Sequence, residues 1–149
     1  MKLEAHVVSL TLPAEAEYID LVRLTLYGIS SKLGFSYEEI EDMKVAVAEA
    51  CNNAVVHAYD PGISGQMEVS FERIEDGLRI IIKDHGPSFD FNEKVSRAGS
   101  LHEKTLNEIN VGGLGIYLMQ ALMDEVEVIT GVGTEVILTK RVSRSEEMV

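Results

Sequence analysis

The stretch that decides the fold is EIEDMKVAVAEACNNAVVHAYD, residues 39–60. It predicts the greater part of a helix that begins at Ser36 and runs to about His57, where Asp60-Pro61-Gly62 breaks it. Ser36 and Glu39 have the spacing of a capping box, and further acidic residues fill the first turns, where they suit the positive end of the helix dipole. A long, well-capped helix is therefore expected in the first half of the chain.

One face of this helix carries polar side chains four residues apart, at Glu49, Asn53 and His57. Asparagine is a poor residue for a helix interior, and Asn52-Asn53 places two in succession. They form either a polar edge stripe with a local side-chain bond, or a site in which a carboxylate base lies beside an amide oxygen that ligates a hard cation. Mg²⁺ would fit the second interpretation, because it keeps waters, takes substrate phosphates and can manage with one protein oxygen.

Towards the N-terminus, the sequence predicts one strand and one helix. Val7–Leu12 alternates partly between apolar and polar positions and ends at Pro13, as a strand does. From Ala14 to Lys32 the apolar residues recur at helical spacing, and Gly34 ends that helix.

Towards the C-terminus, strands predominate. The predicted elements are strands Gln66–Glu75 and Leu78–Asp84, helix Leu114–Met123, and strands Glu125–Thr130 and Thr134–Arg141. Asp76-Gly77 is a strong signal for a two-residue hairpin turn, and Gly131-Val132-Gly133 turns the last pair of strands. The polar segment His85–Val111 has little periodicity, which is typical of a functional loop or lid.

The order of these elements predicts an α+β fold. Hairpins mixed with helices favour a two-layer sandwich, with a mostly antiparallel sheet and the helices on one face. The length of 149 residues suits one domain, expected over residues 1–142, with residues 143–149 as a frayed tail.

Composition and charge narrow the function classes. A net charge of −12 repels phosphate backbones and anionic lipid, which disfavours direct binding of nucleic acid or membrane. Cys51 is the only cysteine, so the chain has no internal disulfide and is typical of an intracellular protein. Neither a signal peptide nor an apolar run long enough to span a bilayer is present, so we expect a cytoplasmic protein.

Three further segments are candidates for ligand binding. Asp84 and Gly86 follow an apolar strand, where a carboxylate suits a donor such as an exocyclic amine, although strand ends often carry Asp and Gly. Gly113 and Gly115 begin a helix and could let a phosphate approach, although a flexible helix start would look the same. Thr134, after the last hairpin turn, could offer a hydroxyl to a ligand.

Taken together and in this order, the segments resemble the GHKL ATPase family. That family has an N-box on a helix, an Asp-x-Gly box after a strand, a mobile lid, a Gly-x-Gly box before a helix and a late Gly-Thr. The segments EIEDMKVAVAEACNNAVVHAYD, DHGPSFDF and GGLGIYLMQALMDEV further resemble the anti-sigma-factor serine kinases. The resemblance covers the chain from Leu3 to about Val142.

The resemblance implies a role for each matching residue, with ATP and Mg²⁺ as cofactors. It implies that Glu49 is the general base, that Asn53 is the Mg²⁺ ligand, and that Gly113 and Gly115 lie beside the phosphates. For the adenine, it implies that Asp84 accepts a hydrogen bond from the amino group, that Gly86 lets the purine approach, and that Thr134 supports both Asp84 and adenine. It also implies that Arg23 binds protein partners. The chain departs from the pattern at Ser88, where the Asp box usually has a second glycine near the lid hinge.

The resemblance also implies partner switching. Such a protein sequesters a stress-type sigma factor and phosphorylates a serine of a small anti-anti-sigma protein, and its relatives are homodimers. A nucleotide-gated sigma-binding module with little or no kinase activity is the alternative. A histidine-kinase catalytic domain is disfavoured, because it needs a helix pair that carries the acceptor histidine.

Overall fold

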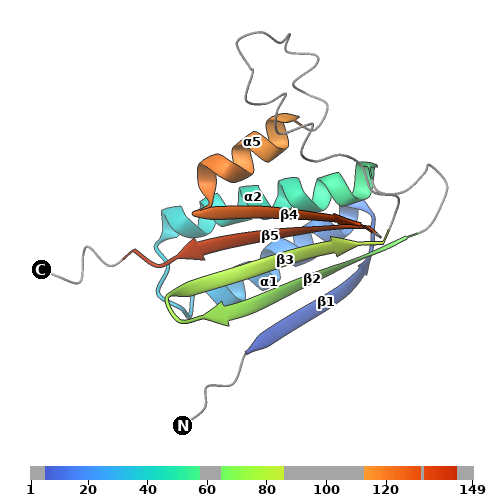
Figure 1. Ribbon diagram of the computed structural model, residues 1–149. Helices are drawn as coiled ribbons and strands as arrows, with labels where there is room; N and C mark the ends of the chain where they lie inside the picture. Colours follow the sequence, from blue (N-terminus) through green and yellow to red (C-terminus); the bar gives the residue numbers. More distant parts are fainter. Residues whose placement is uncertain (1–5, 58–64, 86–112, 132, 144–149) are drawn as a thin grey trace, which may run out of the picture.

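A computed structural model describes residues 6–57, 65–85, 113–131 and 133–143 (Figure 1). In chain order the elements are β1 (Val7–Pro13), a short 3₁₀ helix (Ala16–Tyr18), α1 (Ile19–Ser30), α2 (Tyr37–His57), β2 (Gln66–Ile74), β3 (Gly77–Asp84), α5 (Gly113–Leu122), β4 (Glu125–Gly131) and β5 (Gly133–Arg141). The predicted order of strands and helices is confirmed. Apart from their first residues, His85 and Ser143, the predicted lid and tail lie outside the described residues.

The five strands form one antiparallel sheet in the order β1-β2-β3-β5-β4. Side chains on one face are buried in alternation, for example Met67, Val69 and Phe71 along β2. Figure 1 shows α1 and α2 together behind the sheet, and α5 packs against α2. The predicted α+β sandwich is therefore confirmed, and its core lies between the sheet and these helices.

Helix α1 begins later than its apolar pattern predicts. The Ala14 amide donates to the Gly65 carbonyl at 2.9 Å, and the Glu15 amide donates to the Pro13 carbonyl at 2.8 Å. These bonds turn the chain after β1, and the short 3₁₀ helix follows before α1 starts at Ile19. The prediction of a helix from Ala14 is wrong, because backbone bonds to the neighbouring strands satisfy these groups first.

The capping box of α2 is confirmed. The Glu39 amide donates to Ser36 Oγ at 3.1 Å, and the Ser36 amide donates to Glu39 Oε1 at 2.7 Å. The other carboxylate oxygen of Glu39 accepts from the Ser143 amide at 3.1 Å, so the cap also ties the end of β5 to the start of α2.

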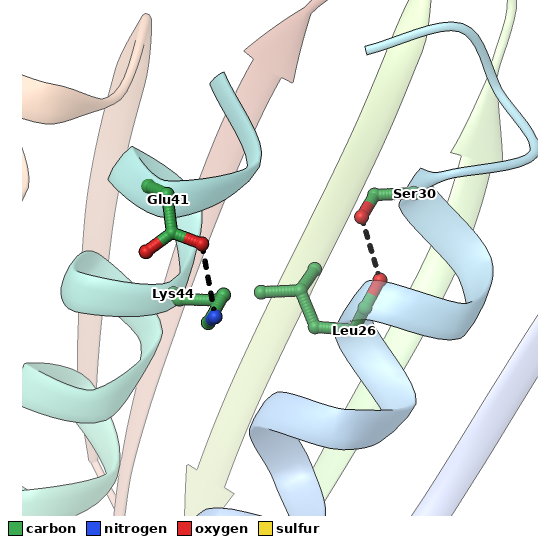
Figure 2. A network of polar contacts seen from close by, with 4 residues as sticks. All are labelled: Leu26, Ser30, Glu41 and Lys44. Atoms are coloured by element: carbon green, nitrogen blue, oxygen red, sulfur yellow. Dashed lines mark hydrogen bonds and ion pairs between the residues drawn. The ribbon is translucent and has the colours of Figure 1, made fainter. Parts of the chain in front are cut away.

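Local bonds within each helix are visible where α1 and α2 lie near each other (Figure 2). The buried Ser30 hydroxyl donates to the Leu26 carbonyl at 2.7 Å, which satisfies a polar group in the core. Lys44 donates to Glu41 at 3.0 Å on the more exposed side of α2.

The β2–β3 hairpin corrects the predicted turn. Ile74 pairs with Gly77, so the two turn residues are Glu75 and Asp76, one position before the predicted Asp76-Gly77. Glycine at 77 has a different reason, since a Cβ there would lie 2.1 Å from the Lys140 carbonyl oxygen of β5. Glycine is therefore required at position 77 because two strands approach closely there, and the turn itself is formed by Glu75 and Asp76.

Candidate functional site

The polar face of α2 lies against α5. Glu49 is half-buried and Asn53 is only 7% exposed, one helical turn further along. A Cβ built on Gly115 of α5 would lie 2.8 Å from Oε1 of Glu49, so the carboxylate rests against the backbone of that glycine. The structure thus brings together Glu49 and Gly115, which are 66 positions apart in the sequence.

A second pair of predicted residues lies at the neighbouring strand ends. Asp84 ends β3, Thr134 follows the first residue of β5, and the two are directly opposite each other in the antiparallel register. Their exposures are 4% and 3%, so both polar side chains are withdrawn from solvent. Between them and the turn lies Gly133, whose φ of +87° and close approach to the Asp84 carbonyl exclude a side chain.

The elements that carry these two groups have ends on the same side of the molecule. Figure 1 shows the C-terminal end of α2, the end of β3 and the start of β5 at the same end. Helix α2 also packs on both β3 and β5. The helix that carries Glu49 and Asn53 therefore contacts the two strands that carry Asp84 and Thr134.

Two buried polar atoms in this region have no hydrogen-bond partner among the described residues, Nδ2 of Asn53 and Oγ1 of Thr134. Leaving a buried polar group unpaired costs about 1–3 kcal/mol, and such groups are uncommon in native proteins. A ligand with matching polar groups would recover this cost. Both atoms belong to residues that the sequence singles out for ligand binding.

A metal ion would need help from such a ligand. Within the described residues, no group of three or more His, Cys, Asp or Glu side chains could hold a metal ion. Asn53 can offer one amide oxygen, and Mg²⁺ completes its shell with waters and phosphate oxygens when the protein supplies few ligands. The donor set therefore fits a cation that arrives with a phosphorylated ligand.

Several predicted residues contribute less to this picture. Gly86 and Ser88 lie outside the described residues. Gly113 is the first residue of α5, so the glycine pair does begin a helix, as predicted.

Arg23 lies apart, on α1, where it forms an ion pair with Asp20. Its positive charge acts on the thiol of Cys51 on α2. Burial raises the pKa of the Cys51 thiol to about 12, and the Arg23 charge opposes that rise. Arg23 is thus a partly exposed residue of α1, whereas Cys51 is a small residue of the buried core.

A hollow of about 190 Å³ lies elsewhere, at the β2–β3 hairpin. Arg73, Glu75 and Asp76 contribute to its walls. Antiparallel β3 runs from this hairpin to Asp84, so the hollow is at the opposite end of the strand from the predicted site residues. It has no part in the candidate site.

Comparison with known proteins identifies the family of this chain. The model of the histidine kinase-like ATPase domain matches residues 12–140. The serine-protein kinase RsbW of Bacillus licheniformis is 47% identical over 145 residues, which are 97% of this chain and 91% of the relative. The chain belongs to the RsbW family of serine-protein kinases. RsbW of Bacillus subtilis strain 168 is 45% identical, over 94% of this chain and 88% of its own length.

A solved structure shows the same fold. It contains the RsbU and RsbW domains of a Mycobacterium tuberculosis protein, and it matches with a TM-score of 0.67 at 24% identity. The match covers 93% of this chain and 33% of that longer chain. Membership of the RsbW family confirms the resemblance found from the sequence. In the described part of the chain, no helix is long and apolar enough to cross a membrane.

Two features of the site escaped sequence reasoning. The contact between Gly115 and Glu49 and the approach of Gly133 to Asp84 both depend on how distant elements pack. The signal in each case was a glycine, Gly115 within the predicted phosphate-binding pair and Gly133 directly before Thr134. That signal was interpreted as flexibility or as a turn, because spacing alone does not show which backbone lies opposite.

Proposed function

We propose that this chain binds Mg-ATP at the end of the fold where Glu49, Asn53, Asp84 and Thr134 gather, and phosphorylates a serine of a small anti-anti-sigma protein. In the same scheme it sequesters a stress-type sigma factor. The observation that carries the proposal is the pair of buried polar atoms, Asn53 Nδ2 and Thr134 Oγ1, that have no hydrogen-bond partner in the part of the chain that the structure describes. The RsbW family name supports the serine-kinase class.

Adenine is the base that fits the strand ends. The Asp84 carboxylate only accepts hydrogen bonds, so it suits the exocyclic amino group of adenine. The Thr134 hydroxyl lies opposite and has both donor and acceptor capacity for the ring or for Asp84. Because both side chains are almost fully buried, these bonds would form away from competing water.

The phosphates would lie between α2 and α5. Gly113 starts α5, and the first amides of a helix favour anions. The amide oxygen of the Asn53 side chain would hold Mg²⁺, which would supply positive charge to stabilise the phosphates during transfer.

Glu49 would act on the substrate serine. Its carboxylate would accept the hydroxyl proton as the serine oxygen bonds to the γ-phosphorus and the bond to the β-phosphate oxygen breaks, leaving ADP. A positioned base of this kind contributes roughly 10²–10⁴-fold to the rate. A pure nucleotide sensor would not need Glu49, which favours the kinase over the binding module.

Partner contacts are expected on a different side. Arg23 is half-exposed and belongs to α1, a different helix from the one that carries Glu49 and Asn53, so a protein could contact it while ATP is bound. The resemblance also implies a homodimer that acts in the cytoplasm.

Intact-mass analysis of a transfer mixture tests the proposal. The mixture contains this protein, Mg-ATP and a candidate anti-anti-sigma protein, with EDTA in a parallel sample. One added phosphate on the partner, absent with EDTA, is expected. If ATP binds by calorimetry and a panel of such partners gains no phosphate, the kinase proposal fails and the nucleotide-gated binding module takes its place.

A further inference from the structure

The contact between α5 and the proposed base is unusually close. Gly115 is buried on α5, and a Cβ built on it would lie 2.8 Å from Oε1 of Glu49 and 3.8 Å from both Cβ and Cδ of that residue. Real Cβ atoms essentially never come within 3.0 Å of another heavy atom in this way. Only glycine at position 115 leaves the carboxylate where it is.

The kind of atom in this contact matters. At Gly77 and Gly133 an added Cβ would meet backbone atoms at 2.1 Å, which the fold would have to move. At Gly115 it would meet the far end of a flexible side chain. A side chain there would therefore displace the Glu49 carboxylate at little cost to the fold.

Within the described residues, the Glu49 side chain has no hydrogen bond or ion pair. The packing of α5 on α2 is thus what limits where its carboxylate can lie. A general base has to reach its proton at about 2.6–3.2 Å, and a misplacement of about 1 Å can cost roughly 10²-fold in rate.

We propose that Gly115 is a positioning residue that fixes the Glu49 carboxylate, in addition to any contact that the glycine pair makes with phosphate. The proposal rests on the proposed role of Glu49 as the base. It joins the start of α5, where the phosphates are expected, to the base by direct contact. A shift of α5 along α2 would therefore change the space that is left for the base.

The first test measures position without any reaction. The side-chain carboxyl ¹³C resonance of Glu49 is assigned by NMR in the wild-type chain, in Gly115→Ala and in Gly28→Ala. Gly28 is the matched control, because it is a helical glycine with nothing within 4 Å of an added Cβ. We expect the resonance to move in Gly115→Ala alone, with the thermal midpoint kept. An unmoved resonance in a folded Gly115→Ala protein would overturn the proposal.

The second test measures coupling in phosphoryl transfer, at saturating ATP and partner. At saturating ATP, which removes any loss of ATP affinity from the comparison, Gly115→Ala should lower kcat by roughly 10–100-fold. Glu49→Asp shortens the side chain and withdraws it from the added methyl. It should therefore lower kcat less in the Gly115→Ala background than in the wild type.

Two outcomes separate this proposal from the proposed function. If the two substitutions multiply as independent effects, Gly115 does not act through Glu49 and the inference is wrong. If the wild-type chain transfers no phosphate to any partner, the proposed function fails, and the NMR comparison still decides whether Gly115 positions the carboxylate.

Discussion

Asp84 and Thr134 lie directly opposite each other, at the end of β3 and near the start of β5, and both side chains are buried. Two polar residues in such a cross-strand pair make a poor structural core but a good recognition surface. Gly133 allows this geometry, because its missing side chain leaves room for the Asp84 carbonyl. The pair is the part of the site that we expect to recognise the base of the nucleotide.

Asp84→Asn should weaken ATP binding by at least about tenfold. A hydrogen bond to a charged group is worth about 1.5–3 kcal/mol, and about 1.4 kcal/mol corresponds to a factor of ten. The substitution also introduces a donor that faces the donor of the adenine amine. Titration calorimetry with Mg-ATP measures the change.

Asp76→Asn is the matched control for that titration. Asp76 lies in the β2–β3 turn at the other end of β3, where it pairs with Arg141 at 3.3 Å. ATP affinity should stay within about twofold, because a surface ion pair contributes little even to stability. Equal losses in both variants would show that Asp84 acts through the fold rather than through the ligand.

Thr134→Val should separate stability from binding. The hydroxyl of Thr134 is buried without a partner among the described residues, so its removal should leave the melting temperature of the free protein unchanged or raised. ATP affinity should fall about 2–10-fold, as expected for loss of one neutral hydrogen bond. Thr25→Val, which removes a hydroxyl bonded to the Leu21 carbonyl on α1, serves as the control. Tighter ATP binding by Thr134→Val would contradict the site.

Gly133→Ala should destabilise the fold. The residue has a φ of +87°, and an added Cβ would lie 2.1 Å from the Asp84 carbonyl oxygen. Strain of this kind costs on the order of 1–3 kcal/mol or more. Gly28→Ala in α1 should instead stabilise by up to about 1 kcal/mol, since it improves helix propensity in open space. Urea unfolding of both variants should give free-energy changes of opposite sign.

Cys51 should make stability fall at high pH. Burial raises the pKa of its thiol from 9.0 to about 12, against the opposing charge of Arg23. The folded protein therefore keeps the thiol proton where the unfolded chain has released it. The stabilising effect is complete below about pH 9 and is lost as the pH rises towards about 12.

The comparison with Cys51→Ala isolates this effect from other titrations. Between about pH 8 and 11, the free energy of unfolding should fall more steeply in the wild type than in the variant. Below about pH 9, a thiol reagent should modify Cys51 of the folded wild type no faster than the protein transiently unfolds around it. Parallel pH profiles would mean that the thiol is not protected by burial.

Local sequence signals predicted the elements well because their causes are local. The Ser36–Glu39 capping box and the spacing of Glu49 and Asn53 act within a turn or two of one helix. The predicted start of α1 was wrong because the Ala14 amide donates a hydrogen bond to the carbonyl of Gly65, which is far along the chain.

The site was only partly predictable for the same reason. Asp84 and Thr134 could be named as ligand residues, but their pairing depends on the register of β3 with β5. Gly77 was assigned to a turn, but glycine is required there because the Lys140 carbonyl of another strand lies close to it. Positions that depend on distant backbone carry no local signature in one sequence.

The most direct test of the central claim is a single-turnover comparison of the wild type with Glu49→Ala, using Mg-ATP and the partner that accepts phosphate. We predict that Glu49→Ala binds ATP within about threefold of the wild type but transfers phosphate roughly 10²–10⁴ times more slowly. Glu41→Ala, which removes an acidic residue paired with Lys44 on the same helix, should transfer at the wild-type rate. Transfer by Glu49→Ala at the wild-type rate would contradict the account.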